Sequence, residues 1–196
     1  MSQPSFTDAL TTFYSRAWWR SELKHYIDEH EIDLGRILPH VGAIGLLDVA
    51  ELPGDRFEFP RVGQVVQPTI TCLTFEALDD DEEPYDLVAL PIGEPQAPMS
   101  LFGSVGFLNH TAVFWPGSYS MGKVMPVHRH ALDWLKAGCR GTAIIHPAIA
   151  ARQMIDLPGP LLAEDDRHRA ELVRVARSVV REREIVAPPS KMRAAA

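Results

Sequence analysis

The chain has 196 residues, of which 46% are hydrophobic and 23% are charged, and its formal net charge is −7. A chain of this length can bury a substantial core, which excludes the small proteins that depend on disulfide bonds or metal ions for their stability. No apolar run approaches the roughly 18 residues that span a bilayer, and the first ten residues lack the basic and apolar regions of a signal peptide. We therefore expect a soluble, cytoplasmic protein that makes no membrane contact.

Charge is distributed unevenly along the chain. Residues 1–126 contain 18 acidic and 7 basic residues, whereas residues 127–196 contain 8 acidic and 12 basic ones. The acidic balance of the first part excludes a protein that is basic over its whole surface and coats nucleic acid. Any contact with a polyanion is therefore expected in the last third of the chain.

The first predicted element is an amphipathic helix that begins at Phe6. Apolar residues recur at spacings of three and four as far as Ile27, and Ser5 with Asp8 forms a capping pair. The aromatic residues that we consider for partner binding are Phe13, Tyr14, Trp18 and Trp19. The helix either lies with its apolar face on a sheet or presents an aromatic surface to a protein partner.

Short β-branched and aromatic runs indicate strands in the middle of the chain. Arg56–Phe59 alternates like an edge strand that Pro60 ends. The runs that follow are Val65–Val66, Ile70–Phe75, Leu87–Pro91, Leu101–Phe107, Thr111–Trp115 and Lys123–Val127. Breaks rich in Pro, Gly and Asp separate them at spacings typical of an antiparallel meander, and the acidic residues 79–83 are expected to form a solvated hairpin loop. Val41–Leu47 permits a strand or a short helix, and we favour a helix or irregular structure there.

A helix, a tight turn, a strand and a second helix are predicted between His130 and Met154. Apolar residues on one side of 131–137 indicate a short helix, and Gly138 can take the left-handed conformation that ends it. Thr142–Ile145 reads as a buried strand, and Pro147 fits the first turn of the next helix. Cys72 and Cys139 suit a reducing compartment, and we interpret both as small buried hydrophobic residues.

Histidines near this segment raise the alternative of a metal site. If Lys123–His130 is a strand, His128 and His130 lie on the same face, since strand side chains alternate. His146 and Asp133 would complete a site with an open position for an activated water molecule. The competing interpretation is that these histidines are hydrogen-bonded structural residues.

The C-terminal segment is predicted to form a second clear amphipathic helix. Pro158–Pro160 and the acidic residues 164–166 mark its beginning. At 100° per residue, one face collects the arginines Arg167, Arg174, Arg177 and Arg181. These guanidinium groups either grip the phosphates of a nucleic acid or form a solvated face that pairs with glutamates. The tail from 188 to 196 is expected to be flexible.

Two segments of the chain resemble parts of known proteins. The run His130–Gly141, with the sequence HALDWLKAGCRG, and the earlier Asp55–Pro60, with the sequence DRFEFP, resemble segments of small proteins carried by proteobacterial prophages and other mobile elements. The two segments comprise 18 of the 196 residues and include no catalytic signature. The resemblance implies an accessory role in a mobile element and carries no functional residues with it.

These observations predict one α+β domain over residues 1–187, with a central, mostly antiparallel sheet, an N-terminal amphipathic helix and C-terminal helices. The first functional interpretation is a non-enzymatic accessory or interaction protein that needs no cofactor. It would bind a protein partner, and nucleic acid through the arginine face. The alternative is a metal-dependent hydrolase built on the histidine cluster. The sequence leaves the oligomeric state open.

Overall fold

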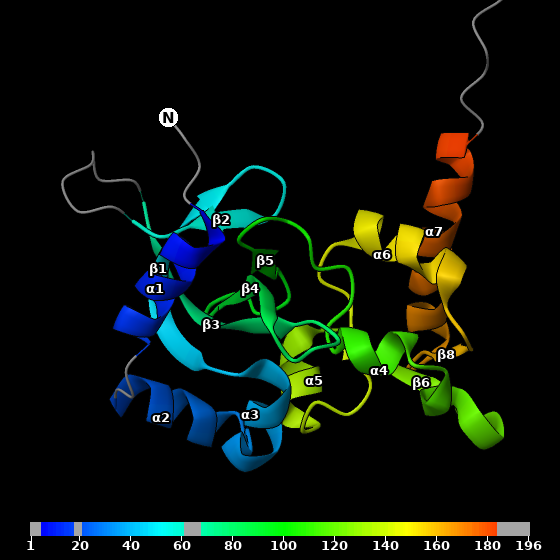
Figure 1. Cartoon of the computed structure of the whole chain (residues 1–196), viewed down its shortest axis with the longest axis horizontal. Helices are drawn as coiled ribbons and strands as arrows, with labels where there is room; N and C mark the ends of the chain where they lie inside the picture. Colours follow the sequence, from blue (N-terminus) through cyan, green and yellow to red (C-terminus); the bar gives the residue numbers. More distant parts are fainter. Residues whose placement is uncertain (1–4, 18–20, 61–67, 184–196) are drawn as a thin grey trace, which may run out of the picture.

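A computed structural model describes residues 5–17, 21–60 and 68–183, and within the last helix it describes side chains as far as Val179. The protein has an α+β fold in which a mostly antiparallel barrel and a smaller parallel sheet lie side by side (Figure 1). None of the helices in these ranges is both long enough and apolar enough to cross a membrane.

Five strands close into the barrel in the order β1-β2-β5-β4-β3. They are β1 (Ile44–Leu52), β2 (Arg56–Glu58), β3 (Ile70–Leu78), β4 (Pro84–Pro91) and β5 (Met99–Ser100). All neighbours are antiparallel except β2 and β5, which pair in parallel at Arg56 and Ser100. Because the ring is closed, β2 is an internal strand and not the edge strand that we expected.

Helices pack on the barrel strands, and the hydrophobic core there has two parts, one on each face of the strands. The helices are α1 (Phe6–Arg16), α2 (Ser21–Glu29), α3 (Leu34–Val41) and α5 (Ala131–Lys136). Leu47 and Cys72, which pair across β1 and β3, belong to the cluster that α1 contributes to through Phe13. Residues that point to the other side of the same strands, such as Phe75, pack with α2, α3 and α5, where Trp134 is buried. Alternation along each strand therefore supplies both cores.

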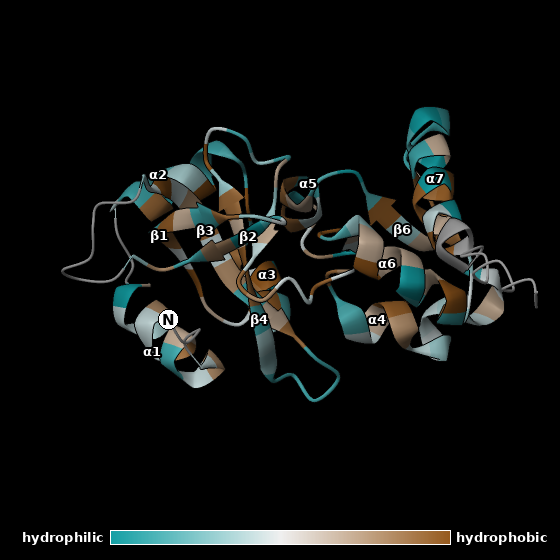
Figure 2. Ribbon diagram, turned by 90° about the horizontal axis from the view of Figure 1, so that it is seen from above, coloured by the Kyte–Doolittle hydropathy of each residue, from teal (hydrophilic) through white to brown (hydrophobic). Residues whose placement is uncertain are grey.

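The remaining described elements form a C-terminal lobe around a three-stranded parallel sheet in the order β7-β6-β8. Its elements are α4 (His110–Phe114), η1 (Pro116–Gly122), β6 (Met125–His128), β7 (Thr142–Ala143), α6 (Pro147–Gln153), η2 (Met154–Asp156), β8 (Leu161–Leu162) and α7 (Asp166–Arg183). Helix α7 packs on α6 at the edge of the molecule and is coloured largely hydrophilic, with hydrophobic bands, in Figure 2.

Several local predictions are confirmed. The Ser5 side chain caps α1 by accepting a hydrogen bond from the amide of Asp8. Gly138, with φ of +65°, follows the end of α5, and Pro147 is the first residue of α6. Residues 79–83 form the turn between β3 and β4. In each case the signal lies in the residues that form the feature, so neighbouring elements do not alter it.

Other local predictions were wrong. Residues 44–47 belong to β1, because Gly42 ends α3 with φ of +58° and Gly45 lets the strand approach the Cα of Ala17. A Cβ on Gly45 would lie 2.9 Å from that atom. Thr111–Phe114 is helical, because Asn109 takes a left-handed conformation and its carbonyl accepts a hydrogen bond from the amide of Val113.

The expected strands and helix boundaries also differ in two places. Leu101–Phe107 is mainly a loop, apart from an isolated bridge between Phe107 and Ile144. The single N-terminal helix that we predicted is two helices, α1 and α2. The predicted strand Val65–Val66 and the predicted tail at 188–196 lie outside the described residues.

Candidate functional site

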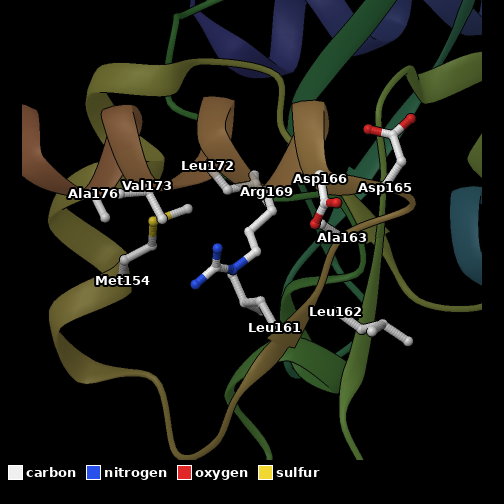
Figure 3. A pocket seen from close by; sticks show the side chains of 10 residues that line it. All are labelled: Met154, Leu161, Leu162, Ala163, Asp165, Asp166, Arg169, Leu172, Val173 and Ala176. Atoms are coloured by element: carbon white, nitrogen blue, oxygen red, sulfur yellow. The ribbon is translucent and has the colours of Figure 1, made fainter.

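An apolar groove opens on the C-terminal lobe between α7, β8 and η2 (Figure 3). Its volume is about 750 Å³. Its walls consist of Met154, Leu161, Leu162, Ala163, Asp165, Asp166, Arg169, Leu172, Val173 and Ala176. The dimensions fall in the range of ordinary ligand and peptide sites.

Helix α7 contributes one wall because its apolar stripe is wider than the surface that α6 covers. His168 and Val179 are buried, at 4% and 8% exposure. Leu172, Val173 and Ala176 lie beside that buried stripe and line the groove instead. An α-helix with a stripe this wide needs a second contact to bury all of it.

Strand β8 forms the facing wall. Leu161 packs against the hydrophobic cluster of the lobe, whereas Leu162 is 51% exposed, as alternation along a strand requires. Gly159 brings the preceding loop against the ring of Tyr119, where a Cβ would overlap the ring. Among the described strands, β8 pairs only with β6, so its other edge remains open.

A network of charged side chains fixes the rim of the groove where α7 begins. The guanidinium of Arg129, from the end of β6, lies 2.8 Å from Asp165 and 3.5 Å from Glu171. The His168 amide donates to Asp165 and, together with Arg129, holds the pKa of that carboxyl below its usual value. Glu164 lies 3.6 Å from His128. The network therefore connects the end of β6 to the beginning of α7 beside the groove.

The four residues of the predicted metal site do not come together. His128 Nε2 bonds to the carbonyl of Arg140 at 2.8 Å, His130 is the residue before α5, and Asp133 lies in that helix. His146 precedes α6 and bonds to Ser100 instead. Within the described ranges no group of three or more His, Cys, Asp or Glu side chains is placed to hold a metal ion. The grouping assumed that one strand carried both histidines, but β6 ends at His128.

His146 takes part in a buried polar network between the barrel and the C-terminal lobe. Its Nε2 lies 2.8 Å from Ser100 Oγ, which also accepts a hydrogen bond from the amide of Gly103. Asp86 is fully buried and accepts hydrogen bonds from the amides of Leu87, Phe102 and Ser104. Ser100 has no exposed surface, so a substrate cannot reach this serine-histidine pair in this conformation. Its geometry fits a structural connection and not a nucleophile.

The two thiols are equally inaccessible. Cys72 and Cys139 are buried, and burial raises the pKa of each to about 12. A thiol with such a pKa is not ionised at neutral pH, so neither has the properties of a catalytic nucleophile.

The described N-terminal residues that we predicted to bind a protein partner differ in their exposure. Phe13 is fully buried in the core, because α1 packs on the barrel, so it cannot form part of an exposed surface. Tyr14 is 49% exposed and donates a hydrogen bond to the buried Glu76. Burial and this carboxylate raise the pKa of Tyr14 to about 12. Trp18 and Trp19 lie outside the described residues.

The predicted arginine face lies on α7. Arg174 and Arg177 are exposed, and Arg167 is exposed but pairs with Glu171 at 3.2 Å. The side chain of Arg181 is beyond the described part of the helix.

The residue pattern did not predict the groove. Leu161 and Leu162 stand between Pro160 and an acidic group, a pattern that indicates only the beginning of a helix. Two adjacent leucines after a proline are a weak strand signal. Their pairing with β6, which lies about 35 residues earlier, cannot be inferred from the local residue pattern. No protein-family model, curated protein or solved structure matches this chain.

Proposed function

We propose that this protein is a non-enzymatic interaction protein that binds a partner polypeptide in the groove of the C-terminal lobe. The observation that supports this most directly is the pair Leu162 and Val173. They are 51% and 37% exposed, and both line the same concave, mostly apolar surface. Exposed apolar side chains gathered in one hollow are typical of contact sites.

The stiffness of the surroundings strengthens the proposal. The groove lies between a helix fixed by the Arg129 network and a strand paired in a sheet, so its walls do not need to be ordered at the moment of binding. A preformed surface loses less conformational entropy on association than a mobile one. The role in a phage or another mobile element is a further part of the proposal, and it rests on the resemblance of residues 130–141 and 55–60 alone.

The experiment is a selection from a random peptide library displayed on phage, with the purified full chain as the target. Leu162→Glu and Val173→Glu each place a charge in the groove at a side chain that is already partly exposed. Leu38→Glu is the matched control, because Leu38 is 41% exposed but lies on α3, away from the groove. We expect peptides with several apolar residues to be enriched on the natural protein and on Leu38→Glu, and lost from both groove variants.

Two outcomes would overturn the proposal. One is that no peptide is enriched over the Val173→Glu protein. The other is that sedimentation finds a dimer that Val173→Glu dissociates, because the groove would then be an interface between two copies of this chain.

A second candidate function is nucleic-acid binding by α7, because Arg174 and Arg177 are exposed and adjacent on one face. Within the described residues neither forms an ion pair. Electrophoretic mobility of DNA and RNA across a salt series tests it. Binding should weaken as salt rises and should be lost in Arg174→Ala/Arg177→Ala, but not in Arg167→Ala, whose guanidinium already pairs with Glu171. The absence of a salt-dependent shift would exclude this function.

A further inference from the structure

We propose that the groove takes an apolar segment that carries an Asp or Glu side chain, and that Arg169 binds this carboxylate. The inference rests on the proposed function, since it specifies the chemistry of the partner segment at the same site. It starts from one charged side chain among the apolar walls.

The Arg169 side chain extends from α7 into the groove, and its guanidinium lies between Met154 and Leu161 (Figure 3). Two nearby arginines, by contrast, already form ion pairs with acidic side chains. Arg129 pairs with Asp165 and Glu171, and Arg167 pairs with Glu171. In the part of the chain that the structure describes, no acidic side chain forms an ion pair with Arg169. Its charge is therefore available to a ligand.

The position of this guanidinium favours a carboxylate over other polar groups. A planar guanidinium binds a carboxylate through two parallel hydrogen bonds, which fixes its orientation as well as its distance. Apolar walls on both sides exclude water once the groove is filled, and an ion pair is stronger where water is excluded. An apolar segment without an acid would cover this arginine and leave its charge unpaired, which is unfavourable.

The acidic end of the groove gives the segment a direction. Asp165 is held by Arg129 and by the amide of His168, but Asp166, in the first turn of α7, has no ion-pair partner among the described residues. Asp166 repels a second carboxylate, and it would also repel phosphate groups. The ligand that fits is thus a polypeptide with one acid over Arg169 and neutral or basic residues toward Asp166, and not a nucleic acid.

The test uses fluorescence anisotropy with a labelled peptide from the display selection and the same peptide with its acidic residue changed to the amide. The C-terminus of both peptides is amidated, so that only the side-chain carboxylate differs. We expect Arg169→Gln to weaken binding of the acidic peptide about tenfold, while its effect on the amide peptide is small. Arg169→Lys should restore part of the difference. Arg174→Gln is the control, because it removes the same charge from the same helix but does not line the groove.

The possible results separate this inference from the proposed function. If selected peptides lack acidic residues, or bind Arg169→Gln as tightly as the natural protein, the assignment to Arg169 is refuted while the groove remains a binding site. If no peptide depends on the groove, both fail. Equal losses in Arg169→Gln and Arg174→Gln would show that only the net charge matters, which also refutes the assignment.

Discussion

Removing the Ser100 hydroxyl should destabilise the whole protein, because this group joins the barrel to the C-terminal lobe. Ser100 is fully buried, and its Oγ lies 2.8 Å from His146 Nε2 and 3.0 Å from the Gly103 nitrogen. In Ser100→Ala the ring nitrogen of His146 loses its partner in a site where His146 is only 7% exposed. A buried polar group without a partner costs about 1 to 3 kcal/mol, and the half-buried Gly103 amide adds to this, so we expect a loss of about 2 to 3 kcal/mol.

Urea denaturation followed by far-UV circular dichroism measures this loss as a lower transition midpoint. Ser178→Ala is the control. Ser178 is exposed on α7, and its hydroxyl donates to the carbonyl of Val175 within the same helix. Its loss should be about 0.5 kcal/mol or less. If Ser100→Ala costs no more than Ser178→Ala, the Ser100–His146 bond does not hold the two parts together.

Two further predictions concern stability. Burial, the main cause, lowers the pKa of both His146 and His168. The folded state therefore binds fewer protons than the unfolded state, so stability is fully present above about pH 6.5 and decreases below it. The melting temperature should be lower at pH 5.5 than at pH 7.5, and a constant value would contradict this. Gly42→Ala should cost at least about 1 kcal/mol more than Gly54→Ala in urea denaturation. Both glycines have positive φ, but a Cβ on Gly42 would overlap the Glu76 carboxylate, whereas Gly54 has open space; equal losses would refute the role of that overlap.

The groove shows why a functional surface is harder to predict than the helix that contributes to it. The apolar stripe of α7 follows from residue spacing, but spacing does not show how much of the stripe another element will cover. Here α7 packs on α6, and His168 and Val179 are buried while Val173 stays exposed. In the sequence Arg169 is equivalent to the other arginines of the helix, and only its place beside Met154 and Leu161 distinguishes it.

For the histidine cluster, the sequence predicted a metal site whose residues lie apart in the structure. His128 and His130 are close in sequence, and their spacing suggested one shared face. In the structure β6 ends at His128, and His146 bonds to a serine 46 residues away. Side chains that are near in sequence share a site only if the backbone keeps a single conformation between them.

By itself, the sequence determined the α+β class, the cap at Ser5, the end of α5 before Gly138 and the beginning of α6 at Pro147, because each depends on the conformational preferences of adjacent residues. Only the tertiary structure decided that five strands close into a barrel and that three others run parallel. It also decided which apolar stripe stays open to form the groove. These features arise from contacts between residues far apart in the chain, and no local pattern encodes which distant surfaces will meet.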